Sequence, residues 1–322
     1  MLFYTAMIKN HIKKIGIVLS VLMTMACFTG SKAFGQYYFY DDSYYDNPLI
    51  FEVGISAGVM NSLTDLGGKK GIGGKFVKDL NMGNNEFVGG LYLGLLYKYL
   101  IGLRLEATVG KVSAYDSILK GVTDIARARY NRNLSFRSSI TEINLMAEFH
   151  PFYAFIDFAA KDYAPPRYSP YLLAGIGYFS FNPQAKLNNR WVDLQPLRTE
   201  GQGFAEYPES KPYKLSAISI PVGGGVKYEL SSLVNVRAEF VYRATNTDYI
   251  DDVSRTYVDE NLFSKYMAGA NLNNAFQLHD RQRGEYLPQS DPGKKRGNPK
   301  DKDNYFSFNV KIGVVLGKER IR

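Results

Sequence analysis

Residues 140 to 149 read ITEINLMAEF and alternate in character with a period of two. Successive side chains of an extended strand point to opposite sides, so a strand here has one apolar and one polar face. The apolar face carries Thr141, Ile143, Leu145, Ala147 and Phe149, and the polar face carries Glu142, Asn144, Met146 and Glu148. The polar face must meet bulk water, a soluble core or the inside of a closed barrel.

The same alternation recurs along the chain in segments of about nine to eleven residues, the length that a tilted strand needs to cross a bilayer. It is found at 51–60, 103–111, 218–227, 234–243 and 306–316. Two further segments, 87–97 and 170–181, are rich in glycine and aromatic residues and alternate less cleanly. We therefore expect about eight strands, an even number as in single-chain bacterial outer-membrane barrels.

Short and long connections take turns between these segments. Those near 98–102 and 230–233 are tight, and the long ones are expected at about 61–86, 113–136, 182–214 and 244–304. Barrels have short periplasmic turns and longer outer loops. The connection 150–169 is long although it belongs to the periplasmic side, and we expect it to extend the barrel wall.

The polar faces carry charges of both signs. An eight-stranded barrel is filled by its own side chains, and buried charges need partners. We predict an interior network of Glu52, Arg104, Glu106, Glu142, Glu148, Lys227, Arg237, Glu239, Arg243 and Lys311, with Glu229 close to it. The predicted fold is all-β: an eight-stranded antiparallel up-and-down transmembrane barrel of the outer membrane, over residues 51–317. The alternative is a soluble antiparallel sandwich, whose strands would average only about five to six residues.

The first 35 residues have the features of a cleavable signal peptide. Lys13 and Lys14 precede an apolar run, 15–28, that is short for a membrane span. Small residues Ala33 and Gly35 predict cleavage after Gly35. Lipidation of Cys27 is the alternative, but the preceding residues lack the usual leucine.

The cysteine content and the net charge exclude several kinds of binding site. Cys27 is the only cysteine, so the mature chain has no disulfide and no thiolate metal site. The net charge of +8 includes four leader lysines, and the remainder is too small to indicate nucleic-acid binding. We expect no cofactor.

Catalytic motifs are weak. The segment 67–75 (GGKKGIGGK) lacks the first glycine and the Ser or Thr of a phosphate-binding loop. The G-x-S-x-G pattern at 54–58 (GISAG) lies inside the alternating segment 51–60 and is no nucleophile elbow, and the mature chain keeps only His150 and His279. We expect His150 to be structural or interfacial rather than part of a lipid hydrolase, and we assign His279 no role. The chain is not expected to be an enzyme.

Two features of the loops remain. Residues 279–304 are charged and poor in apolar side chains, which predicts a mobile loop. The carboxylates of Asp41, Asp42 and Asp46, and those of Asp248, Asp251 and Asp252, have no EF-hand spacing. We expect solvated acidic loops there, with calcium binding as the alternative.

The segment 36–50 begins QYYFYDDSYYDN and precedes the first strand. With an even strand number both termini are periplasmic, so this arm faces the periplasm. Tyrosine is enriched at interface hot spots, but also in the aromatic girdles of barrels, and both interpretations stay open. The docking candidates are Tyr37, Tyr38, Tyr40, Asp41, Asp42, Tyr44 and Tyr45. Residues 318–322 form a C-terminal tail.

Six phrases, in this order, carry a resemblance to a known family. They are 52–66 (EVGISAGVMNSLTDL), 133–149 (NLSFRSSITEINLMAEF), 169–183 (SPYLLAGIGYFSFNP), 194–203 (LQPLRTEGQG), 218–228 (ISIPVGGGVKY) and 247–259 (TDYIDDVSRTYVD). The chain resembles the PorG-like outer-membrane barrels of Bacteroidota, components of the type IX secretion system.

The resemblance implies a non-enzymatic barrel, held by outer-membrane lipids, that associates with a periplasmic ring made of a lipoprotein and its partner. It would support export of proteins with C-terminal signals. A stand-alone surface barrel for adhesion or ligand binding is the alternative, since the fold would be the same.

Overall fold

The computed structural model describes residues 49–66, 82–120, 125–155, 166–231, 233–282 and 291–316. Several expectations lie outside these residues: the signal peptide, Cys27, the glycine–lysine segment 67–75, the tail 318–322 and all seven docking candidates of the arm. The last two residues of the predicted arm, Leu49 and Ile50, belong to the first strand instead.

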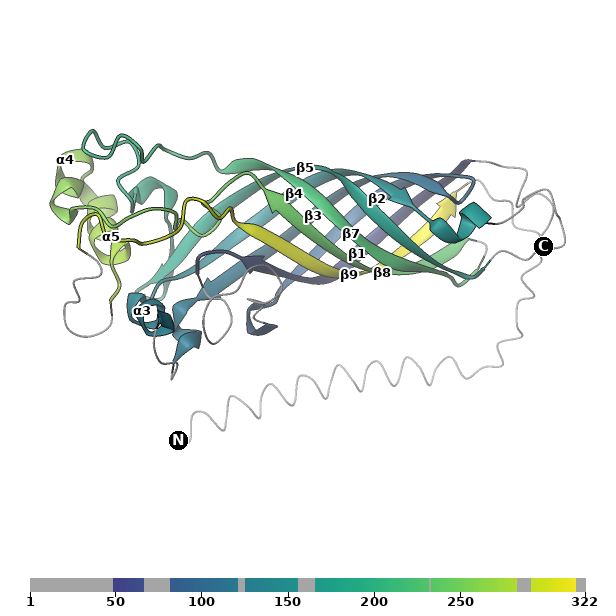
Figure 1. Cartoon of the computed structure of the whole chain (residues 1–322), viewed down its shortest axis with the longest axis horizontal. Coiled ribbons are helices and arrows are strands. Elements are labelled where there is room, and N and C mark those ends of the chain that lie inside the picture. The colour runs from purple at the N-terminus through teal and green to yellow at the C-terminus, as the bar shows by residue number, and fades with distance from the viewer. Residues whose placement is uncertain are drawn as a thin grey trace. The chain divides into compact units, whose positions relative to one another are not determined.

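Eight long antiparallel strands form a closed barrel (Figure 1). They are β1 (Leu49–Leu63), β2 (Glu86–Tyr97), β3 (Ile101–Tyr115), β4 (Ser135–Phe149), β5 (Tyr168–Leu187), β7 (Ser216–Glu229), β8 (Val234–Thr245) and β9 (Asn304–Leu316). Each pairs with the next along the chain, and β9 pairs with β1 to close the ring. A short strand, β6 (Arg190–Asp193), pairs only with β5. The predicted eight-stranded up-and-down barrel is confirmed.

The register places the two faces of β4 as its alternation predicts. Leu145 stands opposite Leu105 of β3 and Ile176 of β5 on the outside. Leu145 is 45% exposed, whereas Glu142 on the inside is 1% exposed. The same arrangement, opposite to that of a soluble protein, is found around the barrel: apolar side chains point outward and most charged side chains point into the lumen. This surface needs lipid around it, as an outer-membrane barrel does, and the soluble sandwich is wrong.

One outward residue differs from the others. Phe306 lies on the outer face of β9 but is buried. Its ring packs against those of Phe240 and Phe308, with centroids 5.8 and 6.0 Å away. Neighbouring aromatic rings therefore cover it from the outside.

The end where β1 begins and β9 finishes, called here the terminal end, has tight connections. Lys98 and Tyr99 turn the chain between β2 and β3 with φ of 49° and 58°. The connection after β4 is longer and begins with the 3-10 helix η4 (Pro151–Phe155). Its residues 156–165 are not among those described.

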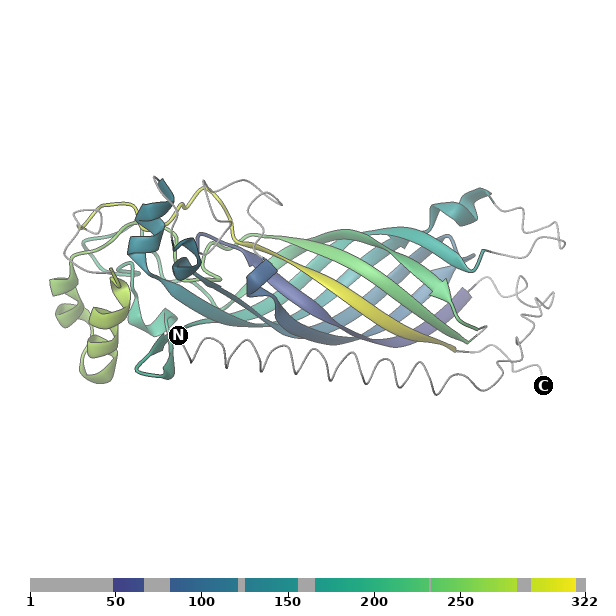
Figure 2. The same ribbon diagram turned by 90° about the horizontal axis from the view of Figure 1, so that it is seen from below.

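The opposite end carries a folded cap, defined here as the described residues among 64–85, 116–134, 188–215 and 246–303. Its helices are η2 (Met82–Asn84), η3 (Asp116–Leu119), α3 (Ile125–Arg132), η5 (Gln195–Leu197), η6 (Glu260–Leu262), α4 (Phe263–Tyr266) and α5 (Gly269–His279). Figures 1 and 2 show α3, α4 and α5 gathered at this end. Among the residues described, no helix is long and apolar enough to cross a membrane.

The cap has an apolar core of its own. The ring of Phe204 stacks on Tyr266 with centroids 4.1 Å apart and meets the edge of Phe263. Leu197, Val258 and Leu278 pack into the same cluster. Strand β5 also continues to Leu187, six residues past its predicted end, and forms a hairpin with β6. The cap is therefore a packed structure.

Candidate functional site

The centre of the barrel is organised by Arg104 of β3. Its guanidinium contacts three carboxylates: Nε lies 3.3 Å from Glu106, Nη1 2.9 Å from Glu148 and Nη2 2.7 Å from Glu239. These carboxylates come from β3, β4 and β8, and all four side chains are buried. One cation therefore ties strands from different sides of the lumen.

Two more cations share these carboxylates. Lys311 of β9 bonds Glu106 at 2.5 Å and Glu239 at 2.8 Å. Arg237 of β8 bonds Glu148 at 3.0 Å and also reaches Glu52 at 2.8 Å. The network thus extends without a break toward the terminal end.

Both ends of the network have a further cation. Lys227 lies 3.4 Å from Glu52 and 3.9 Å from Glu229 at the terminal end. Toward the cap, Arg243 bonds Glu142 at 2.7 Å. The structure thus places all ten predicted interior residues in the lumen, each in an ion pair.

Sequence reasoning missed three tyrosines that complete the network. Tyr92 donates to Glu52 at 2.5 Å, Tyr171 to Glu239 at 2.6 Å and Tyr305 to Glu142 at 2.6 Å. Tyr92 lies opposite Gly54, and a Cβ on Gly54 would lie 2.4 Å from its ring. The sequence signal for Tyr92 was the glycine opposite it: an inward-facing glycine on one strand leaves room for a large ring on the neighbouring strand.

His150 lies at the terminal end of the lumen and is fully buried. Its Nδ1 is 3.0 Å from Ser169 Oγ, and its Nε2 is 3.3 Å from Glu148 Oε2. Serine, histidine and carboxylate are connected in the order of a hydrolase triad, but all three are enclosed. A hydroxyl with no access to substrate cannot attack it, so this histidine has the structural role that the sequence indicated.

The cap contains a second polar cluster, centred on Glu200. Its carboxylate accepts from the backbone N–H groups of Ser254 and Arg255, at 2.9 and 3.1 Å, and bonds Arg296 at 3.0 Å. Arg132 pairs with Asp116 at 2.8 Å and donates to the carbonyl oxygen of Arg296 at 2.7 Å. Arg296 is buried, so the prediction of a mobile charged loop over 279–304 is wrong around it.

The three aspartates expected in a solvated acidic loop are buried instead, which corrects that expectation. Asp251 accepts from the N–H groups of Leu66 and Val253, and Asp252 accepts from two hydroxyls. Neither oxygen of Asp248 has a hydrogen bond of ordinary geometry. Burial raises the pKa of Asp248 to about 7 and that of Asp252 to about 6. Across the described ranges, no group of three or more His, Cys, Asp or Glu has the geometry of a metal site.

His279 ends α5 inside the cap, where Nε2 lies 3.2 Å from the carbonyl oxygen of Val258. Burial lowers the pKa of His279 to about 3, so the ring is neutral. It is a packing residue, with its ring edge against Phe263.

No protein-family model matches the chain, and no curated protein matches it. Similar solved structures include the N-terminal β-barrel domain of Pseudomonas aeruginosa OprF, at 9% identity over 84% of this chain and 98% of that one, with a TM-score of 0.31. Neisserial surface protein A has 10% identity over 82% and 96%, with a TM-score of 0.35. Ail of Yersinia pestis has 10% identity over 83% and 97%, with a TM-score of 0.31. Independently of these values, strand register and exposure identify an outer-membrane β-barrel whose lumen is lined by paired charges.

Proposed function

We propose that this chain is a non-enzymatic, non-conducting structural subunit of the type IX protein secretion system. The observation that carries the proposal is that phrases resembling the PorG-like family meet in the folded cap. Glu200, from 194–203, holds the backbone of 247–259 through Ser254 and Arg255. Asp251, from 247–259, accepts from Leu66 at the end of 52–66. The phrases that resemble the family thus contain residues whose hydrogen bonds stabilise the cap.

The lumen supports a scaffold in preference to a channel. Conduction needs a water-filled path, and here Arg104, Arg237 and Lys311 are buried and bound to carboxylates across the barrel. A small barrel filled in this way offers its outside, its cap and its terminal end to partners.

The terminal end supports periplasmic docking. Phe155 of η4 is 88% exposed and Phe152 of the same helix is 41% exposed. Exposed aromatic side chains are typical anchors of protein interfaces. We propose that these side chains and the tyrosine-rich segment 36–50 each contribute to binding the periplasmic ring.

The experiment is co-purification of ring proteins with the tagged full-length chain from outer membranes. We expect deletion of 36–45, combined with Phe155→Ser, to abolish co-purification while the barrel stays inserted and heat-modifiable. Leu230→Ser is the matched control, because Leu230 is an exposed apolar residue in the turn between β7 and β8 at the same end. Retention of the ring at wild-type yield by the combined variant would disprove docking here.

The folded cap favours a second candidate, a stand-alone surface barrel for adhesion or ligand binding. A strain lacking the chain discriminates the two. Loss of export of proteins with C-terminal signals supports the secretion subunit, whereas normal export with altered surface attachment supports the second candidate.

A further inference from the structure

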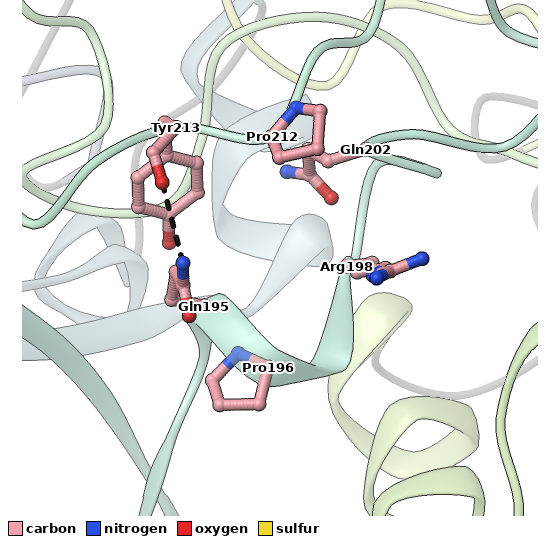
Figure 3. Close-up of a pocket in the computed structure, with 6 residues that line it drawn as sticks. All are labelled: Gln195, Pro196, Arg198, Gln202, Pro212 and Tyr213. Carbon is pink, nitrogen blue, oxygen red and sulfur yellow. Dashed lines mark hydrogen bonds between the residues drawn. The ribbon is translucent and has the colours of Figure 1, made fainter.

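The cap contains a cavity of about 260 Å³, shown in Figure 3. It is lined by Gln195, Pro196, Arg198, Gln202, Pro212 and Tyr213. All six come from the connection between β6 and β7, in the cap at the end of the barrel opposite the terminal end. In an outer-membrane barrel this end faces the cell exterior.

The walls of the cavity are fixed by backbone geometry. Gly203 has φ of 81°, where a side chain is strained, and its N–H donates to the carbonyl oxygen of Ser210 at 2.6 Å. This contact folds the chain back, so that a Cβ on Gly203 would lie 3.1 Å from the ring of Pro212. Below, Gln195 donates from Nε2 to the carbonyl oxygen of Tyr213 at 3.2 Å. The cavity is therefore built before any ligand arrives.

One buried donor in the wall has no partner. Gln202 is 2% exposed, and its Oε1 accepts from the N–H of Glu200 at 3.1 Å. This bond fixes the carboxamide and leaves Nε2 without a hydrogen bond. In Figure 3 the carboxamide lies beside Pro212 and faces the space enclosed by the other residues. A buried N–H without an acceptor is unfavourable, and a ligand oxygen that accepts from it would remove that cost.

The charged residue that lines the cavity is a cation, Arg198. Arg198 is half-buried and has no salt bridge among the described residues. The nearby carboxylate of Glu200 is already neutralised by Arg296, and exposed Lys211 and Lys214 flank the Pro212–Tyr213 wall. The site therefore offers donors and a cation to an anionic acceptor.

We propose that this cavity binds a carboxylate-bearing sugar ring. The carboxylate accepts from Arg198 and from Nε2 of Gln202, while a ring hydroxyl donates to Oε1 of Gln195. The C–H faces of the ring lie against Pro196 and Pro212. An aliphatic carboxylate would lack the contacts with Pro196 and Pro212, and a neutral sugar would offer no anion to Arg198. The proposal is independent of the secretion role.

The test is titration of the full-length barrel in detergent by isothermal calorimetry and saturation-transfer NMR, with D-glucuronate, N-acetylneuraminate and D-glucose as probes. We expect millimolar affinity for the acidic sugars, as is usual for one small polar ligand. We expect glucose to bind at least about tenfold more weakly, since it lacks the carboxylate that makes the charged hydrogen bond. A preference for glucuronate indicates a bacterial surface polysaccharide as the source, and a preference for neuraminate indicates a host glycan.

Variants assign the binding to this cavity. Arg198→Gln should weaken both acidic sugars about tenfold and leave glucose unchanged, whereas Arg190→Gln, an exposed arginine in the neighbouring hairpin, should change nothing. Gln202→Met removes the donor at similar length and should weaken binding too, with thermal unfolding recorded to show that the cap stays folded. Equal binding of glucuronate and glucose, or wild-type binding by Arg198→Gln, overturns the proposal.

Discussion

The lumen and the cap both bury many charges, but they stabilise them in different ways. The buried charges of the barrel strands are six carboxylates and five cations, each in an ion pair, whereas those of the cap are six carboxylates and two cations. In the cap, Asp251 and Asp303 accept from backbone N–H groups, and Asp248 has no such bond. Carboxylates in ion pairs with buried cations keep their charge as pH changes. Buried carboxylates without a cation take up protons as pH falls.

The largest effect is expected from breaking the lumen network at Arg104. Arg104→Gln leaves three buried carboxylates short of a cation, and we expect a loss of about 3–5 kcal/mol in the free energy of unfolding. Urea titration in lipid vesicles, followed by heat-modifiability, measures it. A loss below about 1 kcal/mol would mean that water reaches the lumen and screens the pairs.

A charge on the outer face tests whether the barrel wall meets lipid. Leu145→Arg places a guanidinium in the middle of the apolar outer face of β4 (141–149), with an expected cost of about 2–4 kcal/mol in vesicles. Leu145→Met is the matched control and should cost little. Equal stability of the two variants would contradict a lipid-facing surface.

Protonation of Asp248 should make the cap more stable. The pKa of Asp248, raised by burial from 3.8 to about 7, means that the folded cap binds this proton more tightly than the unfolded chain does. The contribution of Asp248 to stability is therefore fully present below about pH 4 and is lost as pH rises through 7. Asp248→Asn should remove this loss and stabilise the cap at pH 8 by roughly 1–2 kcal/mol, part of the ~4 kcal/mol that the pKa difference allows.

Amide hydrogen exchange of the cap at pH 5.5 and pH 8, corrected for the intrinsic rate, measures this difference. The barrel strands serve as the internal control, since their opening should not change. Faster corrected exchange of the wild-type cap at pH 5.5 than at pH 8 would contradict the sign of the prediction.

The smallest effect is expected at an exposed pair. Lys265 Nζ lies 2.6 Å from Glu206, but the lysine side chain is 60% exposed. Lys265→Gln should leave the stability of the cap unchanged within the error of the measurement, because water screens the pair. Thermal unfolding detects a larger effect, which would indicate that the cap depends on its surface charges.

The barrel was predictable because its signal is local. Alternation along each strand assigns Glu142 and Leu145 to opposite faces, and closure of the barrel decides which face is buried. Tyr92 was missed because Gly89, Gly90 and Gly94 blur the alternation of β2. Its partner glycine lies on another strand, so only the register reveals the fit.

The cap was not predictable in the same way. Asp248, Asp251 and Asp252 are polar residues in a loop, and composition alone indicates solvation. Their burial depends on Glu200 and Arg296, which lie about 50 residues away on either side in the sequence. No periodic pattern in the sequence indicates such contacts. The buried N–H group of Gln202 that lacks an acceptor also depends on the tertiary fold of the cap.

The arrangement of charges in the lumen also has a consequence for assembly of the barrel. A shift of β4 by one residue against β3 would turn Glu142 and Glu148 toward lipid and place Leu145 among the arginines. Arg104 can bond carboxylates of β4 and β8 together only when every strand between them is in its final register. A mispaired barrel would therefore carry unpaired charges into the bilayer, so the lumen salt bridges favour the correct strand pairing over mispaired ones.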